Sequence, residues 1–447
     1  QRPYPGILKK VCVGAAKLKI SPKRDMVIEK LSLKNFRGLL DETIDFDKSL
    51  TVFAGMNGGG KSSALEAIAI MLSWLPVKIS SMDGAGKKIK FTDVTYGAKY
   101  AELEMSLRNS KGEPMTLKMC KYIGSHKKGN SDGMRAAEEF GADMRILLDS
   151  KEGVSAEIPV FAYYGADRNA IGFASPLPSS ARESVYSKAF NAGTDIKTFA
   201  DWFVKMSLSR DAEIDEAAAM PLKKGNERRA EIEKKYAFLR IVKNALAEIS
   251  PEFGSFCVRD GKLFLSAKNV PAAFLSQGEK AVVALIADIA LRMVVANPFK
   301  TNPLETEAII LVDELDIHLH PSWQAAIAEK IQKIFPRTQF VISTHSPTVL
   351  SFAKVAYRLA SVAGGCRFER VDSQYGRNPA DILTNVMESK RERSVEAKFR
   401  TIYECIDRGK FGTAGRLIDE LSDVLPDDPE LLRVEYIYRA LSAPKGK

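Results

Sequence analysis

Residues 55–63 (GMNGGGKSS) fit the pattern G-x-x-x-x-G-K-[ST] through Gly55, Gly60, Lys61 and Ser62. Glycines let the backbone curl around a phosphate with φ values that a Cβ would forbid, while backbone N–H groups point at the anion. In such a loop the lysine contacts the β- and γ-phosphates and the serine hydroxyl binds Mg²⁺. The pattern therefore predicts a nucleotide-phosphate site, and a flexible glycine-rich turn is the alternative.

The segments on either side of this loop have the patterns of a strand and a helix. Residues 27–36 (VIEKLSLKNF) and 49–55 (SLTVFAG) are strand-like, and from Ala64 the sequence ALEAIAIML repeats apolar residues at helical spacing. Strand, loop and helix in this order are the context that a phosphate loop requires. The loop residues that we expect to contact the nucleotide are Asn57, Gly58, Gly59, Gly60, Lys61, Ser62 and Ser63.

A second apolar strand ends in two carboxylates. In residues 308–316 (AIILVDELD), five apolar residues precede Asp313 and Glu314. If this strand lies in a parallel sheet beside the phosphate loop, its carboxyl end meets the Mg²⁺-bound phosphate. We then expect Asp313 to hold Mg²⁺ through water and Glu314 to orient and deprotonate the attacking water. An acidic strand end without a catalytic role is the alternative.

A third apolar strand lies in residues 339–347 (QFVISTHSP) and ends in Thr344 and His345. A histidine at the carboxyl end of a strand can donate a hydrogen bond to a γ-phosphate, and we expect His345 to do so. His318 and His320 follow the acidic strand. We expect them to pack or to contact a neighbour, because no third metal ligand is placed nearby.

The composition fits a globular protein, since the 447 residues are 45% hydrophobic and 27% charged. The longest apolar stretch, residues 281–296, is short and carries Asp288 and Arg292, so we expect no membrane segment and a cytoplasmic location. Five cysteines without a C-x-x-C pair argue against a disulfide framework and against a zinc site.

Residues 275–280 (LSQGEK) add a fifth motif to the phosphate loop, the acidic strand, the following Leu315-Asp316 and the THSP of 344–347. In this order the motifs resemble the ABC-type ATPase heads of the SMC, RecF and OLD group. The resemblance implies an α/β fold: a P-loop ATPase head with a mixed sheet and flanking helices, a short helical insertion and a C-terminal helical bundle.

The same resemblance implies a site that two copies of the chain complete. In such heads ATP and Mg²⁺ lie between two subunits, and the signature turn of one subunit caps the nucleotide of the other. Asp316 is expected at the dimer interface. The turn residues expected to act in this way are Ser276, Gln277, Gly278 and Glu279.

The chain departs from the family pattern in one place. Family members use a glutamine between the first and third motifs to contact Mg²⁺, but residues 91–107 contain none, and Asp93 is a substitute that we do not assign. Tyr163, Tyr164 and Arg168 resemble the strand-end tyrosine and arginine of short, defence-associated ATPases. A buried aromatic strand with a surface arginine is the alternative.

We expect five regions. The insertion is short, with helical parts at 197–206 and 227–246, so no long coiled coil fits. The regions are a basic N-terminal extension (1–25), the N-terminal lobe of the head (26–175), the helical insertion (176–255), the C-terminal lobe of the head (256–360) and a C-terminal helical region for packing or partner docking (361–447).

The C-terminal region resembles that of PtuA, the ATPase subunit family of Septu-type anti-phage systems, including retron-linked ones. The resemblance rests on YGRN at 375–378, on Arg391 and Arg393, and on the pattern of 406–421. After Ser346 the sequence has neither the D-x-D pair of a TOPRIM nuclease nor a histidine for an HNH nuclease. We therefore expect a slow ATPase, homodimeric or larger, that controls a separate PtuB-like HNH nuclease; DNA or a retron nucleic acid is a further candidate partner.

Two other functions remain open. The formal net charge of +10 favours a polyanionic partner, although a solvated basic surface explains it equally well. A RecF-like clamp would close a basic surface on DNA, and nucleotide held as a structural ligand would need no hydrolysis. The best candidate patch for the clamp is Lys111, Lys118, Lys121, Lys127 and Lys128, with a solvated loop as the alternative.

Overall fold

The computed structural model forms two compact units, Gln1–Gly376 and Arg377–Lys447, which are described separately. The structure describes residues 25–55, 60–124, 131–150, 153, 155–167, 182–191, 195–362, 365–371, 374–385, 393–426 and 428–442.

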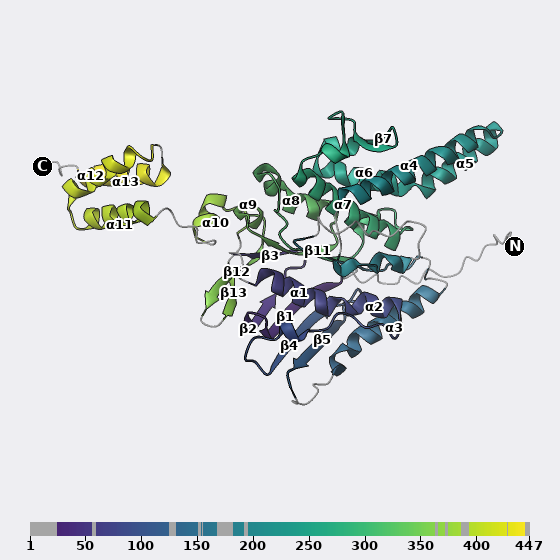
Figure 1. The fold of residues 1–447 in the computed structure, drawn as a ribbon, viewed down its shortest axis with the longest axis horizontal. Helices are drawn as coiled ribbons and strands as arrows, with labels where there is room; N and C mark the ends of the chain where they lie inside the picture. The colour runs from purple at the N-terminus through teal and green to yellow at the C-terminus, as the bar shows by residue number, and fades with distance from the viewer. Residues whose placement is uncertain are drawn as a thin grey trace, which may run out of the picture. The chain divides into compact units, whose positions relative to one another are not determined.

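Ten strands of the described part of the first unit form one mixed sheet. They are β1 (Val27–Phe36), β2 (Leu39–Asp45), β3 (Leu50–Ala54), β4 (Tyr100–Arg108), β5 (Pro114–Tyr122), β6 (Val160–Tyr164), β10 (Ala308–Val312), β11 (Thr338–Thr344), β12 (Val355–Val362) and β13 (Gly365–Val371). The order is β5-β4-β1-β2-β13-β12-β3-β11-β10-β6. Figure 1 labels the strands from β5 to β11 in this order. Strands β12, β3, β11, β10 and β6 pair in parallel, whereas β2, β1, β4 and β5 pair antiparallel. The expected α/β head is thereby confirmed.

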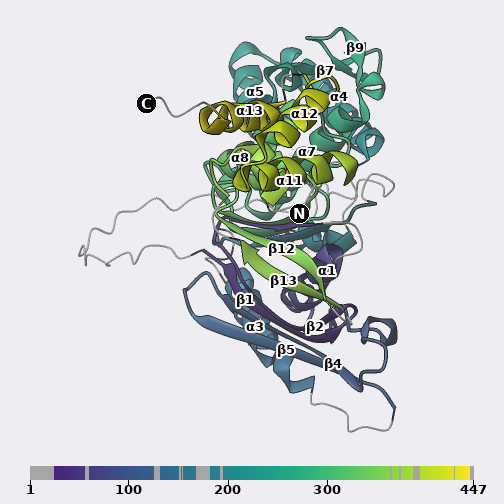
Figure 2. The same ribbon diagram turned by 90° about the vertical axis from the view of Figure 1, so that its left-hand side faces the viewer.

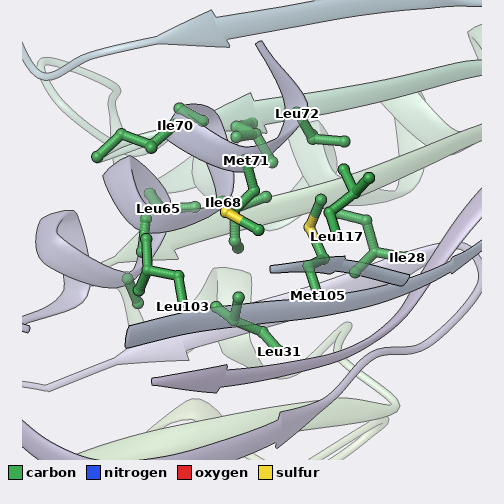
Figure 3. Close-up of a cluster of buried hydrophobic side chains, with 14 of the residues drawn as sticks. Ile28, Leu31, Leu65, Ile68, Ile70, Met71, Leu72, Leu103, Met105 and Leu117 are labelled. Carbon is green, nitrogen blue, oxygen red and sulfur yellow. The ribbon is translucent and has the colours of Figure 1, made fainter. Parts of the chain in front are cut away.

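Helix α1 (Lys61–Leu72) connects the two halves of this sheet. It contacts β10 and β11 of the parallel half and β4 and β5 of the antiparallel half. Its buried face packs into a large apolar cluster, where Ile68 and Met71 lie against Leu31 of β1 and Leu103 of β4 (Figure 3). Because α1 contacts both halves of the sheet, the start of this helix at Lys61 has a fixed position in the head.

Further helices cover the sheet and form the insertion. Figure 2 shows α4, α5, α7 and α8 on one side of the unit and strands β1, β2, β4 and β5 on the other. The α-helices are α2 (Trp74–Ser80), α3 (Arg135–Asp149), α4 (Ile196–Ala218), α5 (Leu222–Lys235), α6 (Ala237–Ile249), α7 (Gln277–Ala296), α8 (Pro321–Ile334) and α9 (Pro347–Leu350). A small antiparallel sheet consists of β7 (Phe256–Arg259), β8 (Lys262–Leu265) and β9 (Val270–Pro271). The 3₁₀ helices are at Phe91–Asp93, Ser131–Met134, Arg182–Tyr186, Ala189–Asn191, Pro251–Ser255, Ala272–Phe274 and Pro303–Glu305.

The insertion projects from the head as a hairpin of α4 and α5 (Figure 1). The two helices cross closely at Gly225, where a Cβ would lie 2.5 Å from the carbonyl oxygen of Ala217. The helical pattern that we read as one segment over 227–246 is divided by Tyr236, whose φ of −102° and ψ of 15° lie outside the helical range. The hydroxyl of Tyr236 donates a hydrogen bond to Glu213 of α4, which fixes the break.

The sequence analysis did not predict that strands extend beyond residue 360, where β12 ends at Val362 and β13 follows. The boundary drawn from the sequence at residue 361 falls inside β12, so the C-terminal region as drawn begins within the sheet. Residues 365–371 alternate only weakly in hydrophobicity, because β13 lies at the junction of the two halves and several of its side chains are half-buried. Strand pairing with β12 and β2, rather than local pattern, explains this segment.

Within the part of the chain that the structure describes, one stretch, Lys61–Ser80, is long and apolar enough to cross a membrane by length and composition. Of its most apolar window, 72% is buried inside the protein. Packing of α1 and α2 in the core therefore accounts for its composition.

The second unit contains a three-helix bundle. Its core includes Phe399, Ile402, Ile418 and Val434, which are nearly inaccessible. The bundle consists of α11 (Arg393–Asp407), α12 (Phe411–Ser422) and α13 (Pro429–Ser442), and α10 (Pro379–Asn385) precedes it in the sequence.

Candidate nucleotide site

The loops that carry the predicted site leave the sheet at one edge. Ala54, at the end of β3, is paired with Thr344 at the end of β11. Val312, at the end of β10, is paired with Ile342 on one side and with Tyr164 of β6 on the other. Because these strands are parallel, the segments after β3, β10, β11 and β6 all begin at the carboxyl edge, where α/β sheets bind ligands.

The phosphate loop has the backbone that the glycine pattern predicted at its two described ends. Gly55 has φ 138° and Gly60 has φ 101°, values that L side chains rarely adopt. Gly60 also caps α1 without a side-chain hydrogen bond, and the first turn of α1 holds no acidic residue. This helix N-terminus is therefore suited to an anion. Asn57, Gly58 and Gly59 lie outside the described residues.

Lys61 is buried beside the predicted acidic residues. Its side chain is 5% exposed, and its Nζ donates a 2.9 Å hydrogen bond to the carbonyl oxygen of Gly55. Burial lowers the pKa of Lys61, and the carboxylates of Asp313, Glu314 and Asp316 oppose that shift. The structure thus brings together residues that are about 250 positions apart.

ATP binding should take up protons at alkaline pH if Lys61 contacts the phosphates. Burial lowers the pKa of the Lys61 amine in the nucleotide-free protein, so a fraction of this amine is neutral at a pH just above the lowered pKa. Bound phosphates would raise the pKa again, and the neutral fraction would then take up protons. Below the lowered pKa the amine is already charged, and no uptake is expected. Calorimetric titrations in two buffers of different ionisation enthalpy measure this uptake. Lys61→Arg is the matched control, since its guanidinium stays protonated. Equal uptake by both proteins would contradict the assignment.

Asp313 and Glu314 are held by one serine that the sequence reading missed. Ser343 of β11 is fully buried, its Oγ donates to the carboxylate of Asp313, and it accepts a 2.7 Å hydrogen bond from the N–H of Glu314. Glu314 has φ 48°, a left-handed conformation that costs a non-glycine residue about 1 kcal/mol or more. The neighbouring structure therefore fixes Glu314 in a strained position. The sequence does show a polar residue within this apolar strand, two positions before His345, and this pattern could have identified Ser343.

Asp316 links the acidic turn to the strand end of β11. Its carboxylate accepts hydrogen bonds from Thr344 Oγ1 at 2.6 Å and from the N–H of His345 at 3.2 Å. Nε2 of His345 is buried and has no hydrogen-bond partner among the described residues. A buried polar atom without a partner is costly unless a ligand satisfies it.

The signature turn begins α7 with a capping box. Ser276 Oγ accepts from the N–H of Glu279, and the Glu279 carboxylate accepts from the N–H of Ser276 at 2.8 Å. Ser276 and Gln277 are exposed, whereas Gly278 is buried. A Cβ on Gly278 would lie 2.4 Å from the carbonyl oxygen of His318, so this glycine is required for the turn to approach the segment after β10.

A cavity of about 690 Å³ opens beside the acidic strand end. Ser62 and Asp313 both line it, as does Tyr163, whose pKa is raised by burial and by the carboxylate of Asp313. Arg37 also lines it and was missed, because its loop follows β1 far from the motifs. Asp93, the substitute considered for the family glutamine, lines the cavity too.

Asp93 is committed to other partners in this structure. Its carboxylate accepts from Arg37 Nε at 3.0 Å and from the N–H of Lys90 at 2.8 Å. Arg37 also pairs with Glu66 of α1. These contacts join the loop after β1 to α1. Arg168 lies outside the described residues.

The residues fit ATP and Mg²⁺ on two observations. The backbone of Gly55 and Gly60 and the N-terminus of α1 suit phosphates. Nε2 of His345, which has no hydrogen-bond partner among the described residues, suits a hydrogen-bonding ligand. The Ser62 hydroxyl and the Asp313 carboxylate offer the oxygen ligands that Mg²⁺ prefers, and they line one cavity. Bound there, Mg²⁺ would neutralise charge on the phosphates.

His318 and His320 have structural contacts. His318 has φ 63°, and its carbonyl oxygen is the group against which Gly278 packs. Nδ1 of His320 accepts a hydrogen bond from the N–H of Ser322 and caps α8. Among the described residues no group of three His, Cys, Asp or Glu side chains is placed to hold a metal.

The lysine patch considered for DNA is partly neutralised. Lys111 pairs with Asp143, and Lys118 pairs with Glu102 and Glu104. Lys127 and Lys128 lie outside the described residues, and Lys121 is half-buried.

Comparisons with known proteins point to one group. A relative named "Retron Ec83 probable ATPase" from Escherichia coli is 28% identical over 72% of this chain and 69% of its own length. "Retron Vc95 probable ATPase" from Vibrio cholerae serotype O1 biovar El Tor is 25% identical over 79% of this chain and 77% of its own. "Septu protein PtuA" from Bacillus thuringiensis is 22% identical over 74% of each.

The family model described as "RecF/RecN/SMC N terminal domain" matches residues 27–367. This range contains every strand of the large sheet up to β12 and all the predicted site motifs, so the resemblance drawn from the motifs is confirmed. The chain belongs to the RecF/RecN/SMC N-terminal domain family.

Proposed function

We propose that this chain binds ATP and Mg²⁺ at the carboxyl edge of β3, β10 and β11 and hydrolyses ATP slowly. The observation that carries the proposal is the convergence of Lys61 with the three carboxylates that follow β10. Lys61 contacts the β- and γ-phosphates, and Ser62 and Asp313 hold Mg²⁺. Glu314 takes the proton of the attacking water, and His345 Nε2 donates to the γ-phosphate.

The active form is a homodimer or a larger assembly in which two chains enclose each nucleotide. Ser276 and Gln277 are exposed at the positive end of α7, where they can reach the phosphate of a second copy. Asp316 lies at the same interface. In this arrangement ATP joins the chains, and its hydrolysis releases them.

The assembly works in anti-phage defence in the cytoplasm, where the chain controls a separate HNH nuclease of PtuB type. Relatives that carry the names of retron ATPases and of Septu PtuA support this role. After Ser346 the sequence has neither a D-x-D pair nor a histidine. The second unit offers a docking surface for the nuclease.

Purification of the tagged chain together with the proteins encoded beside it tests this division of labour. We expect a stable complex with a nuclease subunit, measured by intact mass, and Mg²⁺-dependent ATP turnover by the chain alone. A chain that cuts DNA by itself after stringent purification would refute the separate nuclease. Absence of ATP turnover under all these conditions would refute the ATPase.

A RecF-like DNA clamp is the second candidate, favoured by the net charge of +10. The ion pairs of Lys111 and Lys118 weaken it, because paired lysines release fewer counterions. ATP-dependent, salt-sensitive binding of duplex DNA without a partner protein would favour the clamp.

A further inference from the structure

Three buried polar residues connect α7 to β6, the strand beside the acidic turn. Because α7 begins with the signature turn, it is called the signature helix below. Asp288 and Arg292 lie one turn apart in α7, both side chains are fully buried, and Arg292 Nε donates to Asp288 Oδ2 at 2.7 Å. The hydroxyl of Tyr164, the last residue of β6, donates to the same Oδ2 at 2.6 Å. The backbone carbonyl of Tyr164 accepts a 2.8 Å hydrogen bond from the N–H of Asp313. One residue therefore touches both the signature helix and the metal-binding aspartate.

Arg292 extends the network to the wall of the cavity. Its Nη1 donates to the carbonyl oxygens of Val185 and Ser187, in the segment that runs from residue 182 to 191. Phe190 and Asn191, at the end of this segment, line the same cavity as Ser62 and Asp313. The signature helix is thus bonded to two of the surfaces that surround the predicted metal site.

Stability is a poor explanation for such a network. Burying two charges in a low-dielectric interior costs about as much as their attraction returns, and apolar residues of similar volume often stabilise a fold as well or better. Nη2 of Arg292 is in addition buried without a partner among the described residues. What a buried, directional pair provides is a defined orientation of the elements that it joins.

Orientation matters because each chain contributes to two sites. The turn at Ser276 stands about three helical turns before Asp288 on one stiff helix, and it acts on the partner's nucleotide. Asp313 acts on the chain's own nucleotide. The two sites of a symmetric dimer can close together only if the position of the signature turn relative to Asp313 is fixed within each chain.

We propose that Tyr164, Asp288 and Arg292 are positioning residues that set the signature turn at a fixed offset from the metal-binding aspartate. The proposal rests on the proposed ATPase function of the site. The network holds α7 against β6 before a second chain arrives, so closure of the dimer places both Ser276 residues at once. Loss of the network should slow ATP hydrolysis and weaken ATP-dependent dimerisation while ATP affinity of the single chain remains.

Tyr164→Phe removes the bond between β6 and α7 and leaves the ring and the buried ion pair in place. We expect kcat to fall by about tenfold or more with little change in the ATP affinity of the monomer. Tyr357→Phe is the matched control, because Tyr357 is also buried and its hydroxyl bonds to the backbone of Asp45, away from α7. The Tm of Tyr357→Phe should fall by no more than that of Tyr164→Phe, and its kcat should equal that of the wild type.

A double variant, Asp288→Leu with Arg292→Met, separates positioning from stability. It replaces the buried pair by apolar groups of similar volume, so Tm should be maintained or raised. If the network positions the signature helix, kcat and ATP-dependent dimerisation still fall while ATP binding by the monomer is retained. A variant with unchanged Tm and wild-type kcat would overturn the proposal.

The proposed ATPase function and the positioning role can be refuted separately. If the wild type neither binds nor hydrolyses ATP, the proposed function fails and the positioning role fails with it. If the wild type hydrolyses ATP and the double variant matches its Tm, kcat and dimerisation, only the positioning role is refuted. A fall in kcat that merely follows a fall in Tm across all variants, the Tyr357→Phe control included, would also refute it.

Discussion

Replacing Glu314 by glutamine should lower the rate of ATP hydrolysis by about two to three orders of magnitude and leave ATP binding nearly unchanged. The amide keeps the size and the hydrogen-bonding reach of the side chain but cannot accept the proton of water. The left-handed backbone of Glu314 and its hydrogen bond to Ser343 remain available to glutamine, so the position of the side chain is preserved.

The same variant should accumulate as an ATP-bound dimer, because the nucleotide that joins the chains is no longer removed. Turnover is measured by phosphate release and association by light scattering in ATP and Mg²⁺. Glu329→Gln, at an exposed position of α8, is the matched control and should behave as the wild type. If Glu314→Gln changed neither turnover nor association, the nucleotide would be a structural ligand.

Replacing Lys61 by alanine should weaken ATP binding by about a hundredfold or more, because a buried cation loses its phosphate contacts. The folded protein should not lose stability through the missing charge. Burial lowers the pKa of Lys61, which means that folding disfavours its charged form at pH values below that pKa. Alanine removes this penalty.

Nucleotide binding is measured by calorimetry and the midpoint of unfolding by thermal denaturation without ATP. Lys333→Ala, which removes an exposed lysine of α8, is the control for loss of a positive charge. Unchanged ATP affinity of Lys61→Ala would place the nucleotide elsewhere. A strongly lowered midpoint would show instead that the lysine supports the fold.

The strands that carry the site were predictable because each has a local pattern. Residues 27–36 alternate between buried and more exposed side chains in β1, and the five apolar residues before Asp313 form a strand buried throughout its length. β13 was not predictable in this way, since its place depends on pairing with strands distant in sequence. Local hydrophobicity indicates which side chains are buried, whereas the choice of the strand with which a strand pairs depends on the whole sheet.

The motifs of the candidate site were visible in the sequence, but the residues that support them were not. Glycine-rich and acidic patterns predict roles for Lys61 and Asp313, because phosphate and Mg²⁺ binding need those residue types at that spacing. Ser343 and Arg37 act through contacts across 29 to 56 positions, which no local spacing records. Asp288 and Arg292 were read from the sequence only as charges in an apolar stretch. The structure pairs them in the core.

The proposal that two chains complete each nucleotide site is tested most directly by mixing two inactive proteins. Lys61→Ala disables the phosphate site of its own chain, and Ser276→Arg disables the signature turn that acts on the partner. In a mixed dimer, the intact phosphate site of one chain meets the intact turn of the other, so one of its two sites works. Equimolar mixing should therefore restore between about a quarter and about half of the wild-type turnover, because each mixed dimer has one working site of two. About a quarter is expected if the chains pair at random, and about half if ATP joins only mixed dimers. If the mixture stays as inactive as its components while dimers form, the signature turn does not complete the nucleotide site of a second chain.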